Sequence, residues 1–238
     1  SDDVTFDLPY KVFRPMSLSS RKAAPIVLLC DGDASLDDLM PFLQAIPYRC
    51  IVVCNGLGGD AADDNAASIA LALEDLQRVL NKAGVRRYHL YGQGVVGGIL
   101  AFEYLKQIAQ QDDDDVYDDG DDEGCLSVIL SSTPTNVQKM REEGILSAAA
   151  TASWKTSDDV SSYVASPPSE SAKRMPSCMI VRGEDDIVTQ GSIEGWKALF
   201  CKSRSVREKV LVGDGHHGLV TNPLVYGDCV DTFFGEYD

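Results

Sequence analysis

Short apolar runs alternate along the chain with segments whose apolar residues recur at helical spacing. The runs at 24–33, 48–59 and 125–132 are rich in Val, Ile and Leu, and turn residues end the first two, so they predict buried strands. Segments 35–46 and 65–84 instead carry the spacing of amphipathic helices. Strands that alternate with such helices predict an α/β fold, with a doubly wound, mostly parallel sheet covered on both faces.

The same alternation continues toward the C-terminus. It predicts strands at 86–94, 177–186 and 207–212, and helices at 95–111, 192–202 and 223–237. Residues 133–176 differ, because Ser, Ala and Thr dominate there, and we expect one or two short helices joined by irregular surface chain. We find no repeat, and the pattern predicts a polar, irregular extension over 1–22 followed by one domain over 23–238.

Composition and charge limit the kinds of partner that the protein is expected to bind. The 238 residues are 44% hydrophobic and can bury one sizeable core, while no apolar run approaches the ~18 residues of a membrane span. A net charge of −16 argues against nucleic acid as a partner. Nine of the twelve residues in 112–123 are acidic, so this block predicts a solvated surface loop. The alternative is a docking segment for a basic protein partner.

The seven cysteines are odd in number and scattered, which predicts free, buried thiols in a reducing compartment. Cys50 and Cys54 are four residues apart, but no second ligand pair follows, so we expect no metal site, and no motif indicates a cofactor. The chain does not start with Met. This start, with the polar 1–22 segment, is compatible with a removed transit peptide, so the cytoplasm and a plastid or mitochondrial interior both stay open.

Three motifs carry candidate chemistry. "LYGQGVVGG", residues 90–98, stands at a strand-to-helix junction where many hydrolases place a nucleophilic serine between glycines, and here Gly94 occupies the position of the serine. "VRGEDDIVTQ" contains Asp186 three residues after a glycine. "VGDGHHGLVTNP" contains His216 seven residues before a proline. In this order the motifs resemble the α/β-hydrolase superfamily, and most of all its proline iminopeptidase-like branch, over about residues 24–132 and 177–236.

The resemblance implies that Gly94, Asp186 and His216 meet at the C-terminal ends of the strands as nucleophile position, triad acid and triad histidine. A glycine has no side chain with which to attack a carbonyl carbon, so the triad is expected to be vestigial. His217 could exchange roles with His216 if the alignment is shifted by one residue. Ser131 and Ser132, at the end of a neighbouring strand, are poor replacements for the nucleophile.

Three further departures from the family pattern accompany the resemblance. The oxyanion loop, usually of His-Gly-Gly-Pro type, corresponds here to Cys30, Asp31 and Gly32, and a carboxylate there would oppose a forming oxyanion. From the residues alone, Asp31 and Asp33 are turn residues at a helix N-terminus. The second elbow glycine is Val96, which we expect to weaken the close approach of strand and helix. About forty-five residues over 133–176 leave room only for a reduced cap.

These observations predict a catalytically inactive α/β-hydrolase-like protein that serves as a binding or structural subunit of a larger assembly. An alternative is an enzyme of altered chemistry in which His216, oriented by Asp186, is a general base. A second alternative is a hydrolase or peptidase whose nucleophile the alignment misses.

Overall fold

The structure, a computed structural model, describes residues 10–14, 23–31, 35–57, 68–110, 124–146, 158–172 and 174–238. Seven strands form one sheet in the order β1-β3-β2-β4-β5-β6-β7. These strands are β1 (Tyr10–Phe13), β2 (Ile26–Cys30), β3 (Ile51–Asn55), β4 (Arg87–Gln93), β5 (Gly124–Ser131), β6 (Ser177–Gly183) and β7 (Val206–Leu211). All neighbouring pairs are parallel except β1 with β3. The prediction of a mostly parallel sheet is confirmed.

The edge strand β1 corrects one expectation. Residues 1–22 were expected to be irregular, but Tyr10 pairs with Cys54 and Phe13 pairs with Ile51 in antiparallel register. In this short strand, Tyr10 and Phe13 are half-buried while Lys11 and Val12 are exposed. The described part of this segment therefore belongs to the sheet. The division of the chain at residue 22 stays a prediction.

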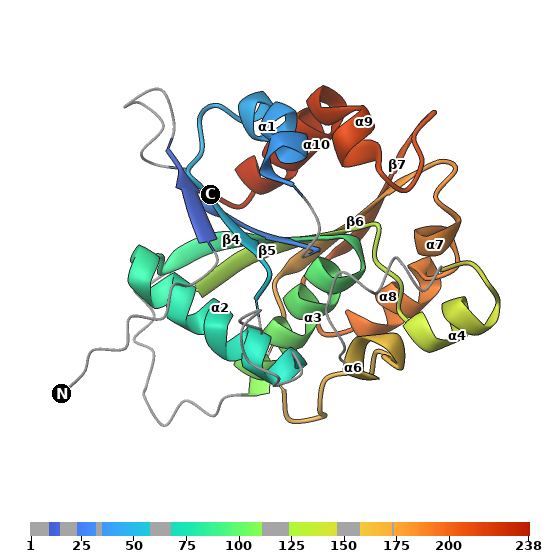
Figure 1. The fold of residues 1–238 in the computed structure, drawn as a ribbon. Helices are drawn as coiled ribbons and strands as arrows, with labels where there is room; N and C mark the ends of the chain where they lie inside the picture. The colour runs from blue at the N-terminus through green and yellow to red at the C-terminus, as the bar shows by residue number, and fades with distance from the viewer. Residues whose placement is uncertain are drawn as a thin grey trace.

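Helices cover both faces of the sheet (Figure 1). One face carries α1 (Leu36–Ala45), α9 (Gly218–Thr221) and α10 (Pro223–Gly235), which contact one another. The other carries α2 (Ile69–Ala83), α3 (Gly94–Gln110) and α8 (Ile193–Leu199). Alternate residues of the central strand β2 point to opposite faces, so Leu28 joins the core under α1 and α10 while Leu29 joins the core under α2 and α3.

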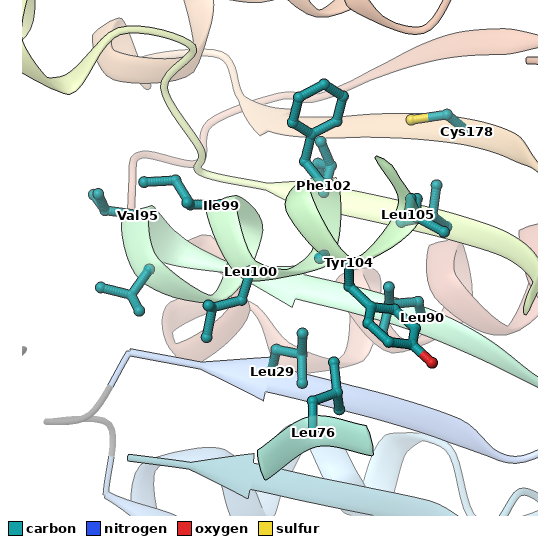
Figure 2. Packing of buried hydrophobic residues seen from close by; sticks show 14 of the residues in the cluster. Leu29, Leu76, Leu90, Val95, Ile99, Leu100, Phe102, Tyr104, Leu105 and Cys178 are labelled. Atoms are coloured by element: carbon teal, nitrogen blue, oxygen red, sulfur yellow. The ribbon is translucent and has the colours of Figure 1, made fainter. Parts of the chain in front are cut away.

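Helix α3 is buried along most of its length. Figure 2 shows its apolar side chains, among them Leu100 and Leu105, packed close to Leu29 and Leu90 of the sheet and Leu76 of α2. A helix that is apolar on nearly all sides must be enclosed by other elements. The surrounding core therefore holds the N-terminus of α3 in place at the end of β4.

A polar network extends from the buried His89 of β4 to Asp238 at the end of the chain. The His89 ring is fully buried, stacks on Phe234 and has hydrogen-bond partners in Ser127 (2.8 Å) and Asp238 (3.1 Å). Asp238 also accepts hydrogen bonds from Arg49 at 2.7 and 2.9 Å. Burial lowers the pKa of His89 to about 4, against the partial opposition of the Asp238 carboxylate. His89 is therefore a packed, neutral side chain.

In its described part, the segment between β5 and β6 contains the short helices α4 (Val137–Glu142) and α6 (Asp158–Ser161). Its assignment as a reduced cap over 133–176 stays a prediction. The acidic block 112–123 lies outside the described residues. All seven cysteines are free. Within the described segments, no helix combines the length and apolarity needed to cross a membrane.

Candidate functional site

The junction of β4 and α3 has the geometry of a sharp strand-to-helix turn. Gly94 is the first residue of α3 and has a φ of +77°, in the left-handed region that a residue with a Cβ rarely adopts. Three residues later, a Cβ at Gly97 would overlap the backbone carbonyl of Leu29 in β2. The expectation that Val96 weakens the approach of helix and strand is therefore wrong, because Gly97 provides that close approach and Val96 packs into the core.

Asp31, the residue after β2, caps the N-terminus of α3. Its Oδ1 accepts hydrogen bonds from the backbone N–H of Val96 (2.8 Å) and Gly97 (3.2 Å), and its Oδ2 accepts one from Val95 (3.3 Å). The first N–H groups of a helix lack partners within the helix and carry its positive dipole end, so a carboxylate is stabilised there. A helix N-terminus was one of the expectations for Asp31, and the structure identifies that helix as α3.

The same carboxylate fills the space where a side chain at Gly94 would begin. A Cβ added to Gly94 would lie 2.7 Å from Asp31 Cγ and would overlap Oδ2. In the family that the motifs resemble, the N–H of the residue after the nucleophile stabilises the oxyanion. Val95 N–H, which corresponds to that donor, already binds Asp31. The Asp31 side chain therefore occupies both the space beside Gly94 and the N–H of Val95.

His216 and Asp186 form a hydrogen-bonded pair on the loops that follow β7 and β6. His216 Nδ1 lies 3.0 Å from Asp186 Oδ1, and the Asp186 side chain is fully buried while that of His216 is 26% exposed. Asp186 also caps the short helix α7 (Ile187–Gln190) and accepts a 2.7 Å hydrogen bond from the Thr189 hydroxyl. Burial raises the pKa of Asp186, but the hydrogen bonds from His216 and Thr189 outweigh burial and lower it below its ordinary value. The acid is therefore ionised at neutral pH.

The loop that carries His216 is held by Ser132. Ser132 has a φ of 57°, an uncommon conformation for a residue other than glycine, and its hydroxyl donates a 2.7 Å hydrogen bond to the backbone carbonyl of His216. The Ser132 hydroxyl therefore positions the loop through this hydrogen bond. His217 precedes α9 and packs its ring edge-on at 5.1 Å from that of His216. Of the two adjacent histidines, His216 is the one that contacts Asp186.

A cavity of about 520 Å³ brings these groups together. Gly94, Asp31 and His216 all line it, and Gln93 and His217 contribute further polar groups. Apolar side chains from α7, α9 and the segment after α4 form much of the remaining wall; they are Ile145, Leu146, Ile187, Val188, Leu219 and Val220. None of the described residues that line the cavity is Ser, Thr or Cys.

Of the three residues predicted for the oxyanion loop, the structure describes two. Cys30 is the last residue of β2 and is buried, and burial together with the neighbouring Asp31 carboxylate raises the pKa of its thiol. Asp31 caps the N-terminus of α3 and lines the cavity. Gly32 and Asp33 lie outside the described residues. In the described segments, no group of three or more His, Cys, Asp or Glu side chains is placed to hold a metal ion.

Comparisons with known proteins identify the fold. A proline iminopeptidase from Mycobacterium smegmatis superposes with a TM-score of 0.62 at 14% identity, over 96% of this chain and 94% of that chain. MenH from S. aureus gives 0.66 at 13% identity, over 98% and 99%. An esterase from Thermogutta terrifontis gives 0.67 at 13% identity, over 97% and 93%. The chain therefore has the α/β-hydrolase fold.

Sequence comparison does not extend this result. No model of a known protein family matches the chain, and no curated protein matches it. At identities this low, the structural likeness establishes the fold alone. The roles of Gly94, Asp186 and His216 must therefore be argued from their own geometry.

Proposed function

We propose that this chain is an α/β-hydrolase-fold protein without serine-type acyl transfer, which retains the cavity as a binding site and acts as a binding or structural subunit of a larger assembly. The observation that carries the proposal is the position of the Asp31 carboxylate. It lies where the nucleophile would begin, and it accepts the hydrogen bonds that an oxyanion would need. The described walls of the cavity also offer no alternative hydroxyl or thiol.

The energetic consequence is large. Loss of one oxyanion donor in a working site costs about 10²–10³ in rate. Here the donors are engaged by a side chain that is itself negative, so a second negative charge on a tetrahedral intermediate would meet repulsion where it needs stabilisation. Acyl transfer through this site would therefore lack both its nucleophile and its electrostatic support.

The test is a screen of esters and aminoacyl amides with the purified protein, beside a His216→Ala variant. We expect no turnover above that of the variant, because the described residues provide nothing for His216 to activate. Migration of the native protein after mild extraction tests the other half of the proposal. A subunit should run with a larger assembly, and a protein that runs only at the size of one chain would contradict that half.

A second candidate function is an enzyme of altered chemistry, and one observation favours it. His216 keeps its hydrogen bond to the buried, ionised Asp186 while its ring lines the cavity. That arrangement orients an imidazole as a general base for a substrate or a water molecule. Turnover that His216→Ala abolishes, without labelling by a fluorophosphonate, would select this candidate over the first.

A further inference from the structure

The described lining of the cavity carries acidic side chains. Its described lining includes the carboxylates of Asp31 and Asp38 and the rings of His216 and His217, and it includes neither Lys nor Arg. A third carboxylate, Asp186, lies directly behind His216. A site lined in this way presents negative potential to a ligand, which favours cations and disfavours anions.

Asp31 contributes to this preference in two ways. A helix N-terminus is ordinarily a binding site for anions, because its free N–H groups and dipole both attract negative charge. At α3 those N–H groups already bind Asp31, so a ligand carboxylate would lose its donors. The Asp31 side chain is only half-buried and lines the cavity, so its own charge faces whatever enters. An anion is therefore disfavoured for two reasons: the α3 N–H groups already bind Asp31, and the Asp31 carboxylate repels it.

Apart from Gln93, the side chains of the remaining wall are apolar, and six aliphatic ones come from α7, α9 and the segment after α4. Apolar walls favour a ligand with a hydrocarbon body, because burial removes that surface from water. We propose that Asp31 sets the sign of the ligand's charge, so that the cavity binds an amphiphilic ammonium compound and rejects the corresponding carboxylate. The inference rests on the proposed function, since it names the ligand class of the same binding site.

Three six-carbon probes test the proposal at neutral pH: hexylammonium, hexanol and hexanoate. They share one hydrocarbon chain and differ in charge, so their affinities separate the apolar contribution from the electrostatic one. Titration calorimetry with the full chain should show hexylammonium binding about fivefold more tightly than hexanol, the size expected for one partly exposed ion pair. Hexanoate should bind more weakly than hexanol.

Matched variants identify the residue responsible. Asp31→Asn and Asp38→Asn each remove one negative charge from the same cavity, so an effect of overall charge would appear equally in both. Asp38 lies at the exposed start of α1, hydrogen-bonded to Ser35, and does not touch the N-terminus of α3. Asp31→Asn should abolish the preference for hexylammonium over hexanol, and Asp38→Asn should keep most of it. Asp31→Ala, which vacates the N–H groups, should reverse the order and favour hexanoate.

The outcomes separate the inference from the function on which it rests. If hexanol and hexylammonium bind the unmodified protein equally, or if both Asn variants behave alike, the assignment to Asp31 is overturned and the binding site stands. If none of the three probes binds, the cavity is not a binding site of the proposed kind, and the proposed function fails together with the inference. Asp31→Asn nearly preserves the shape of the side chain and keeps the test decisive if Asp31→Ala fails to fold.

Discussion

Replacing Gly94 by alanine should destabilise the protein for two separable reasons. A φ of +77° costs a residue with a Cβ about 1–2 kcal/mol. The new Cβ would also overlap the Asp31 carboxylate, which must then leave the N–H groups of Val95, Val96 and Gly97. Loss of a helix cap costs about 1–2 kcal/mol. The lower entropy of unfolded alanine offsets about 0.5 kcal/mol, so the net loss should be about 2–3 kcal/mol.

The overlap makes the effects of Gly94→Ala and Asp31→Ala interdependent. Asp31→Ala alone should cost about 1–2 kcal/mol, because it removes the same cap. In the double variant the cap is lost only once, so the total should stay at about 2–3 kcal/mol, where independent effects would sum to about 3–5 kcal/mol. We therefore expect the two positions to couple by about 1–2 kcal/mol.

Urea unfolding of the four proteins, followed by far-ultraviolet circular dichroism, measures this coupling. Gly84→Ala is the matched control, since Gly84 also has a left-handed φ, +66°, but no heavy atom lies within 4 Å of where its Cβ would stand. The loss of unfolding free energy caused by Gly84→Ala should add to the loss caused by Asp31→Ala within about 0.5 kcal/mol. If Gly94→Ala and Asp31→Ala are equally additive, the carboxylate does not occupy the space beside Gly94 and the reasoning is refuted.

Three further predictions concern the rest of the molecule. His89 is neutral in the fold, where its pKa is about 4 against an ordinary 6.5. As the pH falls from about 6.5 to about 4, the unfolded chain therefore binds the proton first, and the free energy of unfolding should decrease by about 3 kcal/mol. Urea titrations of His89→Gln should lack this pH dependence. Iodoacetamide should alkylate the exposed Cys201 before the buried Cys54, whose pKa burial raises to about 12, and peptide mass spectrometry would show the reverse order if this is wrong. Deletion of 112–123 should leave the melting temperature within a few degrees, since surface loops contribute little closure entropy; unfolding would show that the block is structural.

The sequence could predict the sheet and the positions of Gly94, Asp186 and His216 because each lies in a contiguous motif at the end of an apolar strand. Parallel strands bring their C-terminal ends to one edge, so motifs far apart in sequence converge once the strands are recognised. The edge strand β1 was missed for the opposite reason. Its four residues stand alone in a polar segment, and they are stabilised by pairing with β3 and by packing of Tyr10 and Phe13 against the core.

The contact of Asp31 with α3 was not predictable from local pattern. The residues it joins are 64 positions apart, and an acid after a strand is typical of a turn. The available signal was indirect, since Asp31 follows the strand that pairs with β4, and α3 begins immediately after β4. The role of Ser132 was hidden in the same way. Its left-handed backbone and its bond to the His216 carbonyl exist only once β5 and the histidine loop are adjacent.

Labelling with a fluorophosphonate tests the central claim most directly, because the reagent reports an activated serine without the need to know a substrate. We compare the unmodified protein, Gly94→Ser and the double variant Asp31→Ala with Gly94→Ser. In Gly94→Ser the new Cβ displaces the Asp31 carboxylate from the N–H groups, but we expect its charge to stay beside position 94 and to oppose a forming oxyanion, so the first two proteins should remain unlabelled. The double variant should be labelled at position 94, because that carboxylate is removed and the His216–Asp186 pair is still present. Labelling of Gly94→Ser as strong as that of the double variant, or labelling of none of the three, would contradict the account.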